Sequence, residues 1–455
     1  MRFSFLVFFL LFFAWACLPK EEQLSTDPIL KLAFSTDTLQ FDTLISGQKS
    51  TFEQLQVYNR AEKAIEITQI RLAGGDNSPY QVIINGNETT TENNIRLLGK
   101  DSLLIIVQYH AQATNENAPV AMPDSLIFLT NGNEQEVKCQ AATQDVYRFG
   151  KHTILQDTTL KADRPFLLTD TLTVAPAVNL TIEAGATFLA QQAAAVNIFG
   201  SLQAQGTNEQ PIVFRNEKLT VEAPSQWPGI HINSPTGEIN LQFTEVRNAQ
   251  NSLCIQNSTM PVMLKNCQLI NQGGYGLLIN QAEIHAENSI FSKSGKAMIC
   301  SYGGAHFYGN HLTINGIGSS LLRRDPLIKV QPEAPETNSK VQANAPHFEL
   351  INSIVWGANQ EEISIEGTDS PAEIIFSLLK TQQDFGNTNL YNNYFSSDLF
   401  QNIEEDNYKL KEDSPQIDQA TPTAVKKDFL DRTRDEKPDI GAFEFIAEED
   451  LTPTE

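Results

Sequence analysis

The chain has 455 residues and a formal net charge of −23 at pH 7, with 19% of its residues charged. This length exceeds one ordinary domain and provides ample apolar material for a core. The negative charge argues against nucleic acid and anionic membrane surfaces as partners, because like charges repel.

The N-terminus has the pattern of an export signal. Arg2 is the only charged residue before position 17, and residues 3–16 are apolar apart from Ser4. This run is shorter than the ~20 residues of a membrane-spanning helix, so it indicates a cleaved signal peptide. The alternative is a buried N-terminal helix. The run ends in Ala14-Trp15-Ala16-Cys17, with small residues at the third and first positions before the cysteine.

This N-terminus resembles that of bacterial lipoproteins, in which a peptidase cuts before a cysteine that carries diacylglycerol. The usual Leu and Ser or Ala are replaced here by Ala14 and Trp15. The resemblance implies a signal peptide over residues 1–16, a lipid on Cys17 and a lipidated tether over residues 17–29. Residues Lys20, Glu21 and Glu22 resemble the signal that sends Bacteroidota lipoproteins to the cell surface. We therefore expect a lipid-anchored outer-membrane protein that faces the cell exterior.

The four later cysteines are Cys139, Cys254, Cys267 and Cys300, and no two of them form a CxxC pair. This spacing argues against a metal cluster, and a chain of this size does not need disulfides to fold. We interpret them as small buried apolar residues. Disulfides between Cys254 and Cys300 or between Cys254 and Cys267 are the alternative.

Residues 30–147 alternate between apolar and polar in short runs separated by turn sequences about ten residues apart. Such spacing without an amphipathic helix predicts a two-layer β-sandwich. The segment resembles the immunoglobulin-like spacer domain that follows the anchor in many Bacteroidota lipoproteins, including at Tyr58-Asn59 and Asp101-Ser102. We expect strands at residues 31–34, 38–42, 52–58, 65–72, 80–84, 102–109, 125–129 and 136–139.

The rhythm changes after about residue 153. Asn266, Asn288 and Asn310 follow each other in steps of 22 residues within similar apolar patterns, and Asn352 lies 42 residues further on. A period of 22 with two or three strands and no helix predicts a β-solenoid, whose stacked coils share one core. An Asn at one corner of each coil predicts a side-chain ladder along the stack. Residues 331–346 would form a loop inserted between coils.

This segment resembles the pectin-lyase-like right-handed parallel β-helix, and Trp227-Pro-Gly-Ile230 is similar to its Trp-x-Gly-Ile coil start. We therefore expect an all-β chain with a sandwich followed by a β-helix over residues 148–445, and an acidic tail over residues 446–455.

The end of the β-helix resembles the segment that closes many bacterial members. The matching pieces are Ser414-Pro-Gln-Ile-Asp418, Asp428, Arg434 and Asp439-Ile-Gly-Ala-Phe-Glu-Phe445, while Asp431 replaces the usual Gly. The resemblance implies a structural cap over the open end of the stack. Asp418, Arg434 and Asp439 would then form a polar network rather than a catalytic or metal site.

Enzymes of this superfamily cleave polysaccharides. Lyases need a Lys or Arg base beside calcium-binding carboxylates, and hydrolases need two carboxylates ~5–10 Å apart. On a solenoid these groups would recur about one coil apart on one outward face, and the sequence shows no such column. It therefore predicts no catalytic residues, no metal and no cofactor.

A candidate ligand site remains around residues 302–325, because aromatic rings stack on sugars and guanidinium groups pair with uronate or sulfate. Its members are Tyr302, His306, Tyr308, His311, Arg323 and Arg324. The alternatives are that His311 caps a turn and that the two arginines lie in a solvated loop.

Two hypotheses follow for function. The first is non-catalytic binding of a glycan or a surface protein by the β-helix, and the second is a divergent polysaccharide lyase or glycoside hydrolase.

Overall fold

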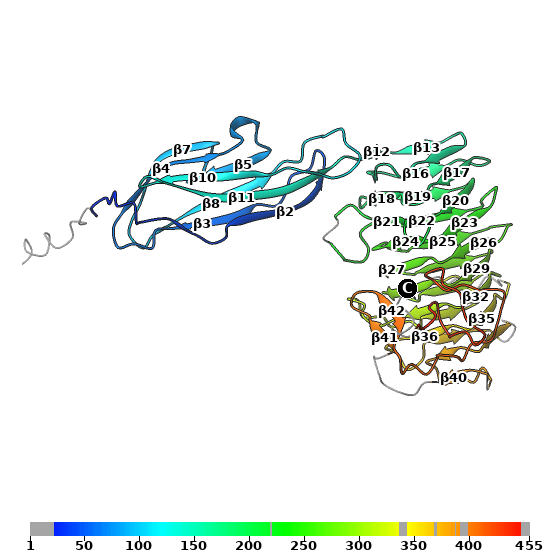
Figure 1. The fold of residues 1–455 in the computed structure, drawn as a ribbon. Coiled ribbons are helices and arrows are strands. Elements are labelled where there is room, and N and C mark those ends of the chain that lie inside the picture. Colours follow the sequence, from blue (N-terminus) through cyan, green and yellow to red (C-terminus); the bar gives the residue numbers. More distant parts are fainter. Residues whose placement is uncertain are drawn as a thin grey trace, which may run out of the picture. The chain divides into compact units, whose positions relative to one another are not determined.

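The computed structural model of the protein describes residues 22–218, 221–335, 344–367, 371–386, 388–391 and 399–446. The chain divides into two compact units, Met1–Val146 and Tyr147–Glu455 (Figure 1). Regular structure in the described residues is β, apart from one short 3-10 turn at Gly75–Asn77. The prediction of an all-β chain with a sandwich followed by a parallel β-helix is confirmed. The predicted lipid site Cys17, Lys20, Glu21 and most of the acidic tail lie outside the described residues.

The first unit is a sandwich of two sheets, with strand orders β1-β3-β8-β5-β6 and β2-β11-β10-β4-β7, and β9 paired to β11. Alternate residues of the longer strands are buried, and their side chains form one apolar core. The strands are β1 (Ala33–Phe34), β2 (Thr38–Ile45), β3 (Glu53–Tyr58), β4 (Ile65–Leu72), β5 (Tyr80–Ile84), β6 (Asn87–Glu88), β7 (Thr91–Leu97), β8 (Ser102–Tyr109), β9 (Val120–Ala121), β10 (Asp124–Thr130) and β11 (Asn133–Gln144).

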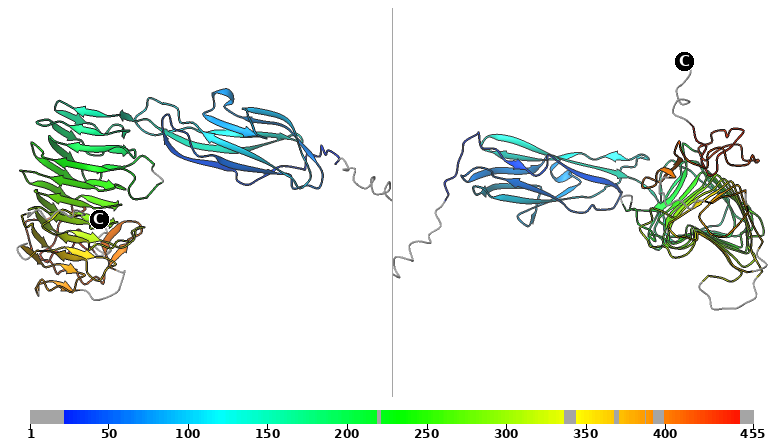
Figure 2. Two further views of the ribbon diagram at one scale, coloured as in Figure 1. Left: turned by 180° about the vertical axis from the view of Figure 1, so that it is seen from behind. Right: turned by 90° about the horizontal axis from the view of Figure 1, so that it is seen from below.

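The second unit winds through three parallel sheets, one strand of each per coil (Figures 1 and 2). We name the sheets 1, 2 and 3 in the order in which a coil visits them. Sheet 1 contains β13 (His152–Ile154), β16 (Leu172–Val174), β19 (Ala195–Ile198), β22 (Gly229–Asn233), β25 (Leu253–Gln256), β28 (Leu277–Asn280), β31 (Ile299–Tyr302), β34 (Ile328–Val330) and β37 (Ile363–Ile365).

Sheet 2 follows sheet 1 in each coil. It contains β14 (Thr158–Leu160), β17 (Asn179–Ile182), β20 (Ser201–Gln205), β23 (Ile239–Gln242), β26 (Val262–Lys265), β29 (Glu283–Glu287), β32 (His306–Asn310), β35 (His347–Ile351) and β38 (Ala372–Ile375).

Sheet 3 completes each coil. It contains β12 (Tyr147–Phe149), β15 (Phe166–Leu168), β18 (Thr187–Ala190), β21 (Ile212–Asn216), β24 (Thr244–Arg247), β27 (Gln268–Gln272), β30 (Ile290–Ser294), β33 (Thr313–Asn315), β36 (Ile354–Trp356), β39 (Leu378–Leu379) and β40 (Leu390–Tyr391).

The inward side chains of all three sheets share one continuous apolar core. Identical residues stack along it: the rings of Phe166 and Phe188 lie 4.9 Å apart, and those of Phe188 and Phe214 lie 4.4 Å apart. Because one coil cannot bury its own apolar side, each coil depends on its neighbours for stability.

The predicted asparagine ladder needs two corrections. Register pairs Glu287 with Asn310, so the residue equivalent to Asn288 is His311 rather than Asn310. The corner residues Asn266, Asn288, His311 and Asn352 share positive φ angles of 52°, 45°, 53° and 55°. Their side chains mostly bind the C-terminal segment instead of one another.

A true amide ladder runs along a different line, at the C-terminal ends of the strands of sheet 3. Nδ2 of Asn248 donates to Oδ1 of Asn216 at 2.7 Å, and Nδ2 of Asn271 donates to Oδ1 of Asn248 at 2.7 Å.

The C-terminal segment lies beside the coils, which corrects the prediction that it caps the open end of the stack. The hairpin β41 (Phe400–Asn402) and β42 (Asn407–Leu410) packs Phe400 and Tyr408 in a cluster with Trp356 of sheet 3. Residues 420–445, here called the corner strap, then follow the corner between sheets 2 and 3. Figure 2 (right) looks along the stack and shows this segment outside the coils.

Candidate functional site

The six predicted ligand residues do not form one cluster. His306 and Tyr308 lie on β32 of sheet 2, whereas Tyr302 ends β31 of sheet 1. Burial first, and then the nearby thiols of Cys300 and Cys254, raise the pKa of Tyr302. Arg324 is exposed on the loop after β33.

The structure contradicts the two remaining candidates. His311 is fully buried and lies in the corner rather than on a surface. The side chain of Arg323 is 4% exposed, and it makes two hydrogen bonds of 2.7 Å to Glu362, whose side chain is 0% exposed. A guanidinium group already occupied by a buried carboxylate cannot bind a glycan anion. Arg323 therefore anchors its loop and is not part of a solvated surface.

His306 and Tyr308 instead belong to a larger polar surface on the outside of sheet 2, here called the site face. It is formed by the outward side chains of β29, β32, β35 and β38, which alternate with buried residues. Register sets these side chains in three rows. The rows are Glu283, His306 and His347; then His285, Tyr308, Glu349 and Glu373; then Glu287, Asn310, Ile351 and Ile375.

Two histidine–carboxylate pairs flank Tyr308. Nε2 of His285 lies 2.6 Å from Oε1 of Glu283, and Nε2 of His347 lies 2.6 Å from Oε1 of Glu349. The ring of His285 stacks on that of Tyr308 at 4.8 Å and 20°, while the ring of His347 lies 5.6 Å away at 47°. Because both neighbours occupy the space beside Tyr308, we expect ligands to meet polar ring edges more than open ring faces.

A hollow of about 260 Å³ opens over the second and third rows. Its lining includes the carboxylates of Glu287, Glu349 and Glu373 and the side chains of Tyr308 and Asn310, and no described lining residue is Lys or Arg. Burial, followed by the charges of Glu283 and Glu349, raises the pKa of Tyr308. The phenol is therefore a hydrogen-bond donor at neutral pH, and the carboxylates give the hollow a negative electrostatic potential.

The second row corrects the conclusion that no two carboxylates recur one coil apart on one outward face. Glu349 and Glu373 are register partners on adjacent strands, next to Tyr308 and then His285. Sequence spacing concealed this column because Tyr308 and Glu349 are 41 residues apart. The signal was the repeated pattern His306-Phe307-Tyr308 and His347-Phe348-Glu349, in which the phenylalanines face the core.

None of the four later cysteines takes part in a disulfide in the described structure, and all four are buried. Cys254 and Cys300 lie on β25 and β31, with β28 between them. Two strand spacings of ~4.8 Å exceed the Cα separation that a disulfide tolerates. Burial raises the pKa of Cys254 to about 11 and that of Cys267 to about 12, so both are unreactive thiols at neutral pH.

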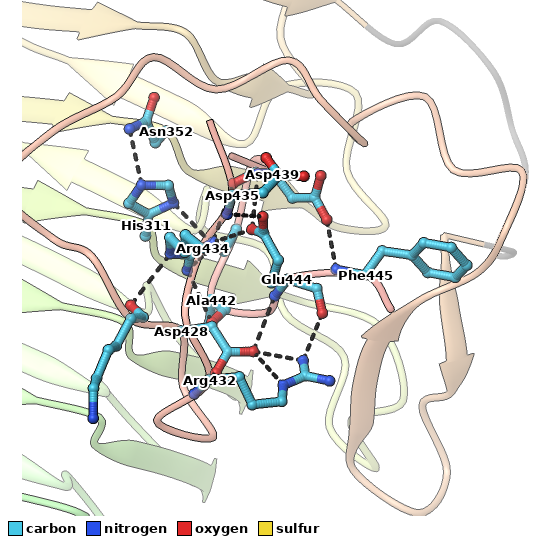
Figure 3. Close-up of polar contacts among 12 residues, drawn as sticks. His311, Asn352, Asp428, Arg432, Arg434, Asp435, Asp439, Ala442, Glu444 and Phe445 are labelled. Carbon is cyan, nitrogen blue, oxygen red and sulfur yellow. Dashed lines mark hydrogen bonds and ion pairs between the residues drawn. The ribbon is translucent and has the colours of Figure 1, made fainter. Parts of the chain in front are cut away.

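Two of the predicted cap residues, Arg434 and Asp439, belong to a buried polar network inside the corner strap (Figure 3), whereas Asp418 is exposed and contributes its backbone N–H. Nη1 of Arg434 lies 3.0 Å from Oε2 of Glu444, and the carboxylate of Asp439 accepts hydrogen bonds from the backbone N–H groups of Asp418 and Phe445. Asp428 is the centre of a turn and binds the side chain of Arg432. These charged groups pair with one another and with backbone, so they hold the strap together.

Within the described ranges, no group of three or more His, Cys, Asp or Glu side chains is arranged to hold a metal ion. The same part of the chain contains no helix with the length and apolarity needed to cross a bilayer.

Comparisons with known proteins agree with the fold of the second unit. Residues 152–252 match the family described as a pectate-lyase-like β-helix domain. No curated protein is significantly similar to the chain.

Several solved structures share weak similarity with part of the chain. One is the PapD-like domain 7 of human CEP192, with 11% identity, 28% of this chain and 92% of that chain covered, and a TM-score of 0.18. Another is a Porphyromonas gingivalis W83 protein of unknown function, with 11% identity, 28% and 60% coverage, and a TM-score of 0.19.

Proposed function

We propose that the β-helix binds an uncharged carbohydrate at the site face without cleaving it. The observation that carries this proposal is the hollow over the column of His285, Tyr308, Glu349 and Glu373. Carboxylates accept hydrogen bonds from sugar hydroxyls, and imidazole and phenol groups can donate to sugar oxygens. Charge-assisted hydrogen bonds to carboxylates are stronger than neutral ones, so a few of them support specific binding.

The negative charge of the hollow argues against the uronate or sulfated ligands that the sequence suggested. Uronates and sulfated sugars need cationic partners, but Arg323 is already paired with the buried carboxylate of Glu362. Three carboxylates in the hollow, within a chain of net charge −23, repel anionic sugars. Neutral oligosaccharides therefore fit this surface better than acidic ones.

An oligosaccharide array tests the proposal. The chain from residue 22 onward should bind neutral oligosaccharides, and Tyr308→Ala should reduce that binding at least tenfold. Thr181→Ala is the matched control, because Thr181 is an outward residue of the same sheet on β17, away from the hollow. Equal binding by the wild type and Tyr308→Ala would refute carbohydrate binding at the site face.

The adjacent carboxylates support a second candidate, hydrolysis of a glycosidic bond. Glu349 and Glu373 lie on strands ~4.8 Å apart, a spacing compatible with the carboxylate pairs of glycosidases. Release of reducing ends from a bound oligosaccharide, lost in Glu373→Gln, would establish this function. Binding without such release leaves the non-catalytic function.

We also propose that a lipid on Cys17 anchors the protein in the outer membrane, with the sandwich as a spacer between the lipid and the β-helix. The support is the Ala14-Trp15-Ala16-Cys17 sequence after an apolar run. Cys17→Ala should abolish labelling by radioactive fatty acid, and equal labelling would refute the anchor. Within the export signal, Glu22 accepts a 2.8 Å hydrogen bond from the N–H of Gly99. Protease accessibility in whole cells should therefore be tested on Lys20→Ala with Glu21→Ala, which leaves this contact intact.

A further inference from the structure

The corner strap contacts the residue that immediately follows each of the neighbouring strands β26, β29, β32 and β35 in the sequence. Asn266 donates to the carbonyl oxygen of Phe429 at 2.8 Å, and Asn288 donates to that of Lys427 at 2.7 Å. Asn352 exchanges two hydrogen bonds with the backbone of Thr421, at 2.8 and 2.9 Å. The strap therefore runs back along the corner, opposite to the direction in which the coils are added.

The strap then turns and follows the same corner a second time. Nη2 of Arg434 donates to Oδ1 of Asn288 at 3.0 Å. The carbonyl oxygen of Gly441 accepts from Nδ1 of His311, and the N–H of Gly441 donates to the carbonyl oxygen of Asn352 at 2.8 Å. His311, Asn352 and Arg434 lie together in Figure 3.

These contacts join the coils that contain β32 and β35. Tyr308 and Glu349 are register partners, but they are 41 positions apart in the sequence, with long connecting segments on both sides of β34 between them. In a solenoid each coil is held only by its neighbours, so such insertions weaken the alignment of the coils that flank them. Gly441 binds the corner residues of both coils at once.

Gly441 is fitted closely to this position. Its φ is 108°, in a region that glycine adopts readily, and a Cβ there would lie 2.7 Å from Cδ1 of Ile354 and 3.1 Å from Oγ1 of Thr313. The strap also reaches the hollow directly, because Nδ2 of Asn310, a lining residue, donates to Oγ1 of Thr423 at 3.2 Å.

We propose that the corner strap is a positioning element for the site face: it holds Tyr308, Asn310 and Glu349 in binding geometry without touching the ligand. This inference rests on the proposed carbohydrate binding for its functional consequence. Its structural part, the alignment of β32 with β35, can be measured without a ligand.

The first arm of the test uses Thr423, which is half-buried and contacts the site through one hydrogen bond. Thr423→Val should weaken binding of the neutral oligosaccharides on the array about fivefold, the effect of losing the hydrogen bond to Asn310. Tm should fall only slightly, because the hydroxyl group also accepts a 3.2 Å hydrogen bond from the N–H of Val425. Thr423→Ser keeps the hydroxyl group and should restore wild-type affinity. A purely structural role would lower Tm and leave affinity unchanged. If Tyr308→Ala abolishes binding but Thr423→Val binds as wild type does, the positioning role is refuted and the binding site stands.

The second arm is hydrogen exchange of the unliganded full chain with Gly441→Ala. Amides of β32 and β35 should exchange at least tenfold faster, while those of β17 and β20, which no described hydrogen bond joins to the strap, should be unchanged. Unchanged exchange in β32 and β35 would overturn the inference. If the wild type binds none of the oligosaccharides, the proposed function fails, and this arm still decides whether the strap aligns the two coils.

Discussion

Nε2 of His311 accepts a hydrogen bond of 3.0 Å from the side-chain amide of Asn352, while Nδ1 of the same ring donates to the carbonyl oxygen of Gly441. These partners require the neutral imidazole with its proton on Nδ1. A second proton on Nε2 would face an amide N–H group, which is also a donor. Burial, followed by the charge of Arg434, lowers the pKa of His311 well below its ordinary value.

The contribution of His311 to the stability of the second unit is therefore lost in acid. The unfolded chain binds a proton at His311 below about pH 6.5 and the folded chain does not, so the contribution of His311 is complete above that pH and is lost below it. We expect His311→Asn, which gives this positive-φ corner the same residue as the equivalent corners, to flatten this dependence. Between pH 7.5 and 5, the stability advantage of the wild type should shrink by about 1 to 2 kcal/mol.

Urea unfolding of both proteins at several pH values measures this difference. Asp439 acts in the opposite direction, because burial raises its pKa to about 6, and protonation below that pH favours the folded state. Both proteins contain Asp439, so its effect cancels in the comparison. Parallel pH profiles of the two proteins would contradict the role of His311.

The buried pair of Arg323 and Glu362 provides a second expectation. Glu362→Gln leaves a buried guanidinium group without its counter-charge and should lower the free energy of unfolding by about 3 to 5 kcal/mol. The neighbouring Arg324 is exposed, so Arg324→Ala should change it by less than about 0.5 kcal/mol. Denaturant titration compares them, and equal small effects would show that Arg323 is not held as described.

The two compact units should fold separately. Each has its own apolar core, one between the two sheets of the sandwich and one inside the coils. Fragments 22–146 and 147–446 should each unfold in one cooperative transition followed by circular dichroism. A fragment 147–446 that is soluble only with the sandwich attached would show that the units depend on each other.

Lyase activity is not expected. Proton abstraction from a uronate needs a cationic environment for the sugar carboxylate, and the described lining of the hollow contains three carboxylates and neither Lys nor Arg. Incubation with pectate, alginate or glycosaminoglycan should release no ultraviolet-absorbing unsaturated products. Their appearance would require a different site and would overturn the non-catalytic proposal.

Sequence periodicity was sufficient for the fold because it records which side of each strand is buried. Seven of the eight expected strands of the sandwich overlap observed strands at nearly the same residues, and the eighth is part of the longer β11. The strand β7 was missed because only Ile95 and Leu97 are buried in it.

The candidate site could be predicted only in part. Spacing of 22 residues pointed to Asn310, but the coil has one more residue there, so His311 occupies the corner. Arg323 resembled a surface residue because its partner Glu362 lies 39 residues away on a later coil. The relation of Glu349 to Tyr308 was missed because the long connections between β33 and β35 hide the coil spacing, whereas Glu373 follows Glu349 at about one coil and was overlooked. Contacts across an insertion of variable length leave no fixed spacing in the sequence.

The most direct test of the proposed carbohydrate site is a hydrogen-exchange footprint of the wild-type chain with a neutral oligosaccharide that binds on the array. We expect amides of β29, β32, β35 and β38 to exchange more slowly when the sugar is bound, and those of β17 and β20 to be unchanged. Protection confined to sheet 1 or to the sandwich, with none on these four strands, would contradict the account.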